Sequence, residues 1–241
     1  MSHAVVLMAS IFLTAEWRSL VMLNYRIDPE VLAPYLPRGL ELDFWNGEAL
    51  VSMVGFLFQR CRVLGLAVPR HQSFEEVNLR FYVRRRVGEE TRRGVVFVRE
   101  IVPRHAIALT ARIFYNEPYV AMPMRHALEG RRIEFAWKWR GAWQSLSAVT
   151  SGEPQAIAPA SEEEFIFEHY WGYTRQRDGG TVEYQVEHPR WRTWRVESAS
   201  LDCDVAALYG PAFLPVLKGP PRSVFVAEGS AVEVRRGVRV A

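Results

Sequence analysis

Residues 74–83 read FEEVNLRFYV, and the alternation in this stretch decides the fold class. The odd positions from 77 to 83 are apolar. The even positions carry, in order, Glu76, Asn78, Arg80 and Tyr82. Successive residues of a β-strand point to opposite faces, so the stretch predicts a strand with one apolar and one polar face. The polar face is either the solvated side of an antiparallel strand or the wall of a site, and the stretch alone leaves both interpretations open.

The neighbouring sequence extends this strand into a sheet. Residues 74–102 predict a hairpin that turns at VGEET, and residues 48–58 predict a strand that is buried on both faces. The same signals predict further strands over residues 106–115, 133–141, 181–191 and 223–237.

Helices are expected to be few and short. Asp28 can cap one helix, and Ser161 with Glu164 forms the capping box of a second. Asp202 is placed to cap a third. Many strands and few helices indicate a β-rich α+β fold, a closed or nearly closed antiparallel barrel with a few short helices. No linker divides the sequence, so all 241 residues are expected to form a single domain.

The composition indicates a globular protein of a reducing compartment. Hydrophobic residues make up 49% and charged residues 24% of the chain, which is typical of a domain that buries a core. Cys61 and Cys203 lie far apart and form no disulfide framework, which favours a cytoplasmic location. The apolar run AVVLMASIFLTA at residues 4–15 is shorter than the about 20 residues that span a membrane, so no membrane association is expected. A formal net charge of +3 gives no reason to expect a nucleic-acid partner.

The motifs of common cofactor and hydrolase sites do not occur in the sequence. It contains no glycine-rich nucleotide loop, no HExxH and no GxSxG, and its six histidines are never paired at metal-ligand spacing. No cofactor and no metal are therefore expected. Any site must be built from polar residues that are embedded in apolar strands.

Two residues stand out because each is a polar residue at an otherwise apolar alternate position of a predicted strand. His188 is in step with the apolar positions of TVEYQVEH, so its imidazole is expected to face the interior or a cavity. It is either a satisfied core histidine or a group that transfers a proton or orients a ligand. Arg18 has the parity of Leu20 and Met22, and an inward guanidinium needs a carboxylate partner from the protein or from a ligand. Together with Glu76, these two residues are the catalytic candidates.

Polar side chains at a helix-to-strand junction are candidates for ligand binding. The stretch EHYWGYTRQR at residues 168–177 holds several of them, although the same residues suit simple packing. The binding candidates from this stretch and from the polar face of FEEVNLRFYV are His169, Tyr173, Arg175, Asn78 and Arg80. A structural alternative also exists, because Arg99 is expected within reach of Glu76 across the hairpin and would form an ion pair with it.

Five blocks spread over residues 11–230 carry a family resemblance: FLTAEWRSLVMLNYRIDPEVLAPYLPRGLELDFWNG, EEVNLRFYVR, GVVFVREIVPRHAIALTARIFYNEPY, EHYWGYTRQRDG and VEHPRWRTW. They strongly resemble the YqjF-like family of uncharacterised conserved bacterial proteins. That resemblance brings no established activity with it.

A more distant resemblance lies in LVMLNYRIDPEVLAPYLPRGLELD, residues 20–43, which is similar to a segment of the acetoacetate decarboxylases. It implies a β-rich, barrel-like cone with the active site in its interior. Alignment on Tyr25 places the substrate-site arginine of that family on Arg18.

The catalytic lysine of that family has no counterpart in the sequence. Its place is held by REIVPRHAI, where Arg104 and His105 are the nearest polar residues, and His105 becomes a further binding candidate. The two lysines of the chain are Lys138, on the charged parity of a tryptophan-rich strand, and Lys218, in a loop. Decarboxylation through a lysine imine is therefore not expected.

Two functions remain open on the sequence. The first is a cytosolic enzyme that acts on a small carbonyl or carboxylate compound without a lysine imine, by hydration, isomerisation or lyase chemistry. Arg18 or Arg80 would hold the anion. Glu76 or His188 would move a proton, and Asn78 would orient the substrate. The second is a non-catalytic binder or sensor that uses the same cavity.

A third function is an interaction scaffold that presents Trp137, Trp139 and Trp143. In the first two cases the partner is a small molecule, expected to be anionic. A homo-oligomer is compatible with the sequence but is not readable from it.

Overall fold

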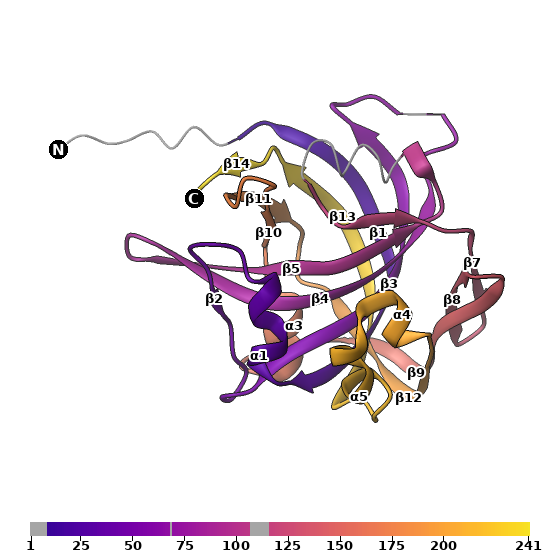
Figure 1. The fold of residues 1–241 in the computed structure, drawn as a ribbon. Coiled ribbons are helices and arrows are strands. Elements are labelled where there is room, and N and C mark those ends of the chain that lie inside the picture. The colour runs from indigo at the N-terminus through magenta and orange to yellow at the C-terminus, as the bar shows by residue number, and fades with distance from the viewer. Residues whose placement is uncertain (1–8, 68, 107–115) are drawn as a thin grey trace.

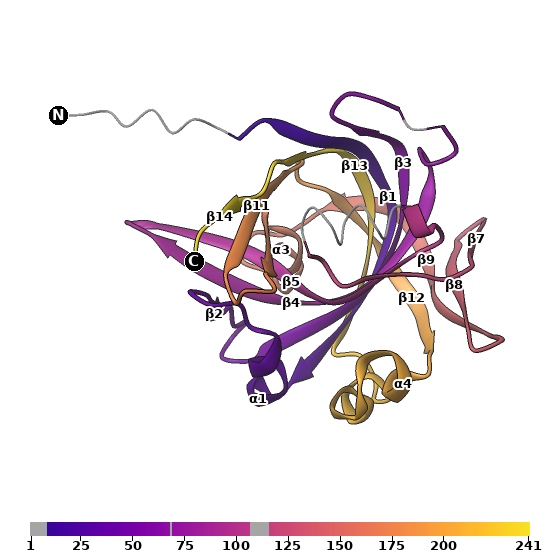
Figure 2. The same ribbon diagram turned by 45° about the horizontal axis from the view of Figure 1, so that its top comes forward.

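The computed structural model describes residues 9–67, 69–106 and 116–241. Within these residues seven strands follow one another around a ring. They are β1 (Ile11–Ile27), β3 (Ala49–Val63), β4 (Phe74–Val87), β5 (Glu90–Val102), β10 (Trp171–Arg175), β11 (Thr181–Glu187) and β13 (Ser223–Arg235). Their order is β13–β1–β3–β4–β5–β10–β11, and β11 pairs again with β13 at Val186–Val234 and Glu187–Glu233. Figure 2 looks into this ring.

The remaining strands extend the sheet beyond the ring. Four of them continue from β13 as a flank, in the order β12 (Arg192–Asp202), β9 (Ala142–Ala156), β8 (Arg132–Trp139) and β7 (Met124–Glu129). The short strands are β2 (Glu41–Leu42), β6 (Tyr119–Ala121) and β14 (Val238–Arg239). The hairpin of β4 and β5, expected over residues 74–102, is confirmed and projects from the ring (Figure 1).

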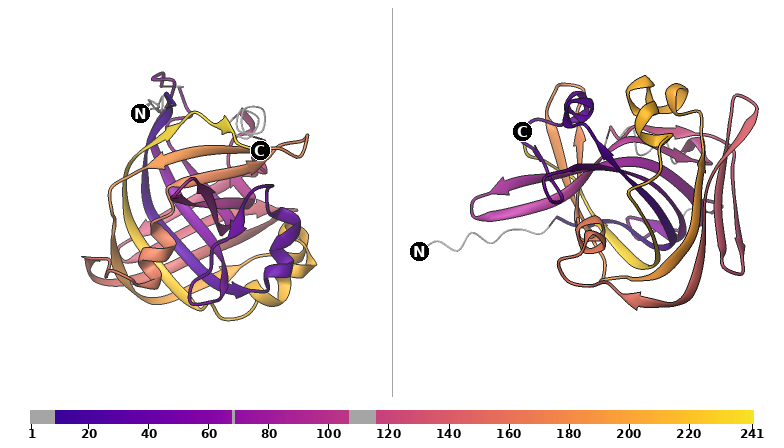
Figure 3. Two further views of the ribbon diagram at one scale, coloured as in Figure 1. Left: turned by 90° about the vertical axis from the view of Figure 1, so that its left-hand side faces the viewer. Right: turned by 90° about the horizontal axis from the view of Figure 1, so that it is seen from below.

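The β-rich fold expected from the sequence is confirmed, with one departure in strand direction. The pairings within the ring are antiparallel except that of β5 with β10, which is parallel and joins Gly94 to Trp171. The parallel pair arises because the connection from β5 to β10 passes through the whole flank of β7 to β9. β1 and β13 lie side by side although they come from opposite ends of the sequence (Figure 3, left).

The helices are short, as expected. They are α1 (Pro29–Leu32), η1 (Ala33–Tyr35), α3 (Glu162–Phe167), α4 (Val205–Tyr209), η2 (Pro211–Phe213) and α5 (Leu214–Leu217). Asp28 caps α1, and the Ser161 hydroxyl caps α3 by accepting from the Glu164 amide at 3.1 Å. The cap expected at Asp202 is wrong. Asp204 caps α4 by accepting from the Ala207 amide at 3.2 Å, whereas Asp202 is the last residue of β12.

Strand β3 is buried on both faces because it separates two apolar clusters, one inside the ring and one between the ring and the flank. Met53 belongs to the apolar cluster between the ring wall and the flank, whereas the next residue, Val54, belongs to the cluster inside the ring. Gly55 faces the flank, where a Cβ atom would lie 2.7 Å from the ring of Phe135. The doubly buried strand predicted over residues 48–58 is therefore confirmed.

Other expectations have mixed outcomes. Trp137 is fully buried rather than presented to a partner, while Trp143 is 40% exposed. The strand expected over residues 106–115 lies, from residue 107 on, outside the described residues. Among the helices that are described, none is long and apolar enough to cross a membrane.

Candidate active site

The polar face of FEEVNLRFYV is the wall of a cavity. The cavity lies inside the ring and has a volume of about 280 Å³. Glu76, Asn78 and Arg80, on one face of β4, all line it. Of the two interpretations that the sequence left open, the structure therefore favours the cavity wall over the solvated face.

Three carboxyl groups meet on this wall. Glu76 lies on β4, Glu100 on β5 and Glu117 just ahead of β6, and their residues are 2%, 2% and 5% exposed. All three line the cavity. No arginine or lysine forms an ion pair with any of them within the described part of the chain. Buried carboxyl groups without a paired cation favour their neutral, protonated form.

Neutral donors satisfy two of the three carboxyl groups. Asn78 donates from Nδ2 to Glu76 Oε1 at 2.9 Å, and the Tyr119 hydroxyl donates to Glu76 Oε2 at 2.9 Å. The Tyr184 hydroxyl donates to Glu117 Oε1, also at 2.9 Å.

The pKa values of the cluster are raised. Burial raises the pKa of Glu76 to about 7, against the opposing effect of the hydrogen bonds from Asn78 and Tyr119. Burial raises the pKa of Glu117 to about 8, and the charge of Glu76 adds to the effect. The pKa of Glu100 is raised well above its usual value by burial and then by the charges of Glu117 and Glu76. The three groups titrate as one coupled system that retains protons near neutral pH.

Among the described residues that line the cavity, Arg80 is the arginine. No carboxylate lies within ion-pair distance of its guanidinium among residues 9–67, 69–106 and 116–241, and its Nε is buried without a hydrogen-bond partner. The guanidinium carbon lies 5.9 Å from the centre of the Tyr82 ring. The ion pair expected between Glu76 and Arg99 is not formed, because Arg99 pairs opposite Leu79, whose side chain packs outside the ring. A half-buried guanidinium that has no carboxylate partner and one unsatisfied donor favours an anionic ligand.

His169 brings a basic nitrogen to the same cavity. Its Nε2 lies 3.1 Å from Asp43 Oδ2, which also accepts from Arg93 Nε at 2.7 Å. Burial lowers the pKa of His169 to about 4, although the hydrogen bond to Asp43 opposes this. A neutral imidazole that donates from Nε2 to Asp43 keeps the lone pair of Nδ1, and that atom is buried without a partner. The hydrogen bond to Asp43 thus determines which ring nitrogen of His169 carries the proton.

His188 also faces the cavity, as its parity predicted. Tyr184, Val186 and His188 all line the cavity from alternate positions along β11 and its end. The His188 ring stacks on Trp191 with 4.0 Å between ring centroids, and its Nδ1 lies 2.9 Å from the Pro189 carbonyl. Burial lowers the pKa of His188. The imidazole is therefore held by its neighbours as part of the aromatic wall.

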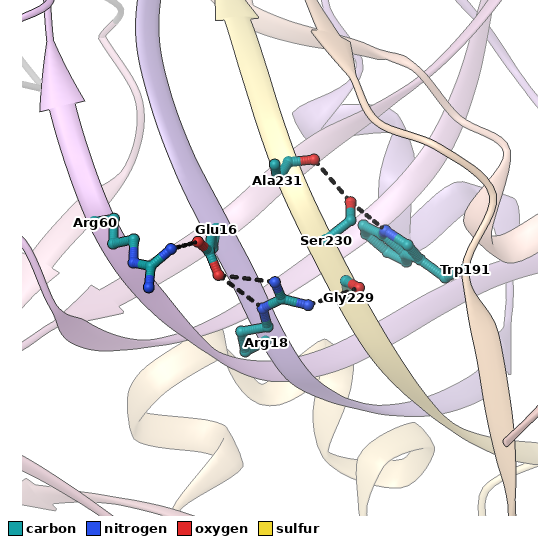
Figure 4. Close-up of polar contacts among 7 residues, drawn as sticks. All are labelled: Glu16, Arg18, Arg60, Trp191, Gly229, Ser230 and Ala231. Carbon is teal, nitrogen blue, oxygen red and sulfur yellow. Dashed lines mark hydrogen bonds and ion pairs between the residues drawn. The ribbon is translucent and has the colours of Figure 1, made fainter. Parts of the chain in front are cut away.

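Arg18 does not point inward, contrary to the expectation from its parity. β1 has a bulge at Ser19, whose φ is 56°, and the pairing with β3 shifts register there. Trp17 and Leu20 therefore both line the cavity. The Arg18 side chain, 40% exposed, binds Glu16 at 2.8 Å between β3 and β13 (Figure 4).

Three other binding candidates lie away from the cavity. Tyr173 is fully buried in the larger apolar cluster, with its hydroxyl 3.5 Å from the Arg92 carbonyl. Arg175 and His105 are exposed. None of these three residues lines the cavity. The structure thus brings together Glu76, Asn78, Arg80, His169 and His188, and adds the residues that sequence reasoning missed: Glu100, Glu117, Tyr119 and Tyr184.

Both lysines of the chain are remote from the cavity. Lys138 and Lys218 are exposed, and neither is among the lining residues. The sequence contains no other lysine, so a lysine imine cannot form in the cavity.

Comparison with known sequences places the chain among uncharacterised proteins. A family profile, DUF2071, described as an uncharacterized conserved protein, matches residues 14–231. A relative, the uncharacterized protein YqjF of Bacillus subtilis (strain 168), is 26% identical over 198 residues, which cover 78% of this chain and 76% of that protein.

Solved structures share the fold at low identity. Acetoacetate decarboxylase from Legionella pneumophila subsp. pneumophila str. Philadelphia 1 is 15% identical, with a TM-score of 0.67, and covers 97% of this chain and 88% of its own. An acetoacetate decarboxylase-like enzyme from Sphingomonas wittichii RW1 is 12% identical, with a TM-score of 0.67, and covers 96% and 94%. The enduracididine biosynthesis enzyme MppR, complexed with pyruvate, is 14% identical, with a TM-score of 0.65, and covers 99% and 93%. The family match spans most of the sequence, so this protein belongs to the DUF2071 family of uncharacterized conserved proteins and has an acetoacetate decarboxylase-like fold.

Proposed function

We propose that this protein is a cytosolic enzyme that moves a proton on a small oxo acid, without forming an imine. The observation that carries the proposal is that one cavity is lined by Arg80, which has no carboxylate partner among the described residues, and by the buried carboxyl group of Glu76, whose pKa is raised to about 7. An oxo acid offers a carboxylate to the first group and a carbonyl oxygen to the second. The two free, buried cysteines suit a reducing compartment.

Arg80 would hold the substrate carboxylate. Guanidinium groups bind carboxylates through two parallel charge-assisted hydrogen bonds, and the buried Nε of Arg80 has a free donor for one of them. A bound carboxylate would also neutralise a charge that the cavity otherwise leaves uncompensated.

Glu76 and His169 would act as acid and base on the bound carbonyl compound. The positive charge of Arg80 lowers the pKa values of both Glu76 and His169, so Arg80 lies within electrostatic reach of each. His169 Nδ1 would accept a proton from the carbon next to the carbonyl. Glu76 would donate a proton to the carbonyl oxygen, which gives the enol. Groups whose pKa values are pushed apart by their surroundings are suited to such paired proton transfer.

The structural neighbours guide the choice of test compounds. MppR was solved with pyruvate and with the condensation product of pyruvate and imidazole 4-carboxaldehyde. A cavity of the same fold that carries an unpaired arginine makes 2-oxo acids the first class to test. Pyruvate and 2-oxobutyrate have exchangeable hydrogens next to the carbonyl, so proton removal is visible as deuterium uptake.

The test combines binding and exchange in heavy water. The wild-type protein is expected to be stabilised by 2-oxo acids in a thermal-shift assay and to catalyse deuterium incorporation that NMR detects. Arg80→Met should abolish both, whereas Arg18→Met, the matched arginine outside the cavity, should leave both unchanged. Glu76→Gln and His169→Gln should each lower the exchange rate about 100-fold or more while stabilisation persists.

The outcomes separate the enzyme from its alternative. Stabilisation that needs Arg80 but comes without exchange of any acid would favour the non-catalytic binder or sensor. Neither stabilisation nor exchange would contradict both functions. Exchange that survives Glu76→Gln and His169→Gln would contradict the assignment of the acid and the base.

A further inference from the structure

We propose that the acid held at Arg80 carries a bulky, aromatic tail, and that the aromatic half of the cavity is the subsite for this tail. The inference rests on the proposed function and names its substrate class: aryl-substituted oxo acids rather than short-chain ones. It comes from a wall of aromatic side chains in the cavity that begins at Phe56, opposite Glu76 on the neighbouring strand.

The cavity has one polar and one aromatic half. The carboxyl cluster and Arg80 form the first. The second is lined by Trp17, Phe56, Phe58, Phe74 and Trp191, which come from β1, β3, β4 and the segment ahead of β12. An amphipathic cavity of this kind orients a ligand that has a charged head and an apolar body.

The aromatic half is a continuous wall of rings. Trp17 lies 5.2 Å from Phe56, 5.8 Å from Phe58 and 6.4 Å from Trp191, each with an edge-to-face geometry. Phe58 stacks on Phe74 with 4.6 Å between centroids. Rings arranged in this way favour a further ring as their guest, because offset and edge-to-face contacts between aromatic groups add to the burial of apolar surface.

The size of the cavity exceeds what a short acid fills. An apolar cavity of about 150 Å³ stays dry and accepts a benzene ring. The volume of about 280 Å³ therefore holds a phenyl group with room for a carboxylate and a carbonyl. A two- or three-carbon acid at Arg80 would leave the aromatic half empty.

An unsatisfied indole N–H in the aromatic half favours a tail that carries a hydrogen-bond acceptor. The indole N–H of Trp191 donates to the Ser230 hydroxyl at 2.8 Å (Figure 4). By contrast, Nε1 of Trp17 is buried and has no acceptor within the described residues, although the Trp17 ring lines the cavity. A tail that bears an acceptor, such as a phenol oxygen, would satisfy this donor, so a hydroxylated ring is expected to bind more tightly than a plain one.

The affinity of a graded series of acids tests the inference. Pyruvate, 2-oxobutyrate, phenylpyruvate and 4-hydroxyphenylpyruvate are titrated against the protein by intrinsic tryptophan fluorescence and by thermal shift. Each buried CH₂ group adds roughly fourfold in affinity, so phenylpyruvate is expected to bind at least about tenfold more tightly than pyruvate. The hydroxyphenyl acid is expected to bind more tightly again.

Variants separate the two halves of the cavity. Trp17→Phe removes the N–H donor together with part of the indole ring, so it should cancel the advantage of the hydroxyphenyl over the phenyl acid and leave pyruvate affinity unchanged. Phe58→Leu should lower phenylpyruvate affinity more than pyruvate affinity. Trp143→Phe, at an exposed position outside the cavity, is the control and should change neither. Circular dichroism confirms that each variant is folded.

An aromatic compound without a carboxylate tests the aromatic half by itself. Benzyl alcohol should stabilise the wild type and Arg80→Met equally, because it occupies only the aromatic half. Equal affinity for pyruvate and phenylpyruvate, with both dependent on Arg80, would overturn the inference and leave the proposed function standing. Stabilisation by benzyl alcohol with no Arg80-dependent binding of any acid would overturn the proposed function and leave the aromatic subsite.

Discussion

The Tyr119 hydroxyl donates a hydrogen bond to Glu76 Oε2 across 2.9 Å. The pKa values of the two groups indicate which of them exchanges a proton. Burial raises the pKa of Tyr119 well above its usual value, and the charges of Glu100 and Glu76 raise it further. The phenol therefore stays protonated at every physiological pH. Tyr119 orients the carboxyl group, and Glu76, with a pKa raised to about 7, is the group that gains and loses the proton.

The stability of the protein is expected to fall as the pH rises from about 6.5 to 8. The pKa values of Glu76 and Glu117 are raised from 4.5 to about 7 and about 8. The folded state therefore keeps protons that the unfolded state has already lost, and each group lowers the free energy of unfolding by about 1.4 kcal/mol per pH unit up to its folded pKa. Urea unfolding at several pH values between 6.5 and 8 measures this slope.

Amide substitutions identify the groups behind this slope. Glu76→Gln and Glu117→Gln mimic the protonated side chains: the first should flatten the pH dependence up to about pH 7 and the second up to about pH 8. Glu153→Gln, at an exposed position, is the control and should leave it unchanged. A free energy of unfolding that rises between pH 6.5 and 8 would contradict the protonated cluster.

His169 is expected to remain neutral at every pH above about 4. Its pKa is lowered from 6.5 to about 4 by burial, so the unfolded state takes up a proton first and His169 reduces stability as the pH falls through this range. Nitrogen NMR of the labelled imidazole should show a proton on Nε2, none on Nδ1, and no titration between pH 5.5 and 8. Asp43→Asn should disturb this tautomer, because the amide no longer serves only as an acceptor. A midpoint of titration near pH 6.5 for His169 would rule out its role as a neutral base.

Glu183 is expected to matter for stability and not for ligand binding. Its side chain is 1% exposed and accepts from Arg85 at 3.1 Å and from Arg92 at 2.5 Å. Glu183→Gln leaves these arginines without a countercharge, and since they retain partial access to water, the expected cost is about 2–3 kcal/mol. Glu41→Gln breaks the exposed pair with Arg84 and should cost less than about 1 kcal/mol. Equal effects in urea unfolding would show that burial of Glu183 is unimportant.

Borohydride is expected to trap no covalent adduct of an oxo acid. Imine formation needs an amine at the bound carbonyl, and Lys138 and Lys218 are both exposed away from the cavity. Mass spectrometry after reduction in the presence of pyruvate should show an unmodified chain. The double variant Lys138→Arg, Lys218→Arg should retain binding and exchange. A lysine adduct together with loss of exchange in the double variant would contradict the imine-free mechanism.

Local sequence signals predicted the strands and caps because their causes are local. The alternation in residues 74–83 and along β11 placed Glu76, Asn78, Arg80 and His188 on the faces that line the cavity. Ser161 and Glu164 fixed the start of α3 by direct hydrogen bonding. In each case a side chain and its neighbours within a few positions determine the outcome.

Two β-bulges limited what could be predicted about the site. At Ser19 and at Val98 one strand carries an extra residue, which moves every following side chain to the other face. The first bulge puts Arg18 and Leu20 on opposite faces, so that Leu20 lines the cavity and Arg18 does not, and the second turns Glu100 in. No residue type marks either bulge in the sequence. Glu117 and Tyr119 lie in the stretch NEPY, whose residue types are typical of a turn, and only the closed ring brings them beside Glu76.

The pairing of β1 with β13 has a consequence for how the protein folds. Arg18 lies opposite Gly229, so the wall of the cavity joins residues about 200 positions apart in the sequence. Contacts of such long range form slowly, because the chain between them must lose its freedom before they stabilise anything. During synthesis the ring stays open, with the apolar edge of β1 unpaired, until β13 has emerged. We therefore expect the full chain to refold slowly. We also expect chains that end before residue 223 to aggregate, because they lack the β13 strand that pairs with β1 and completes the cavity.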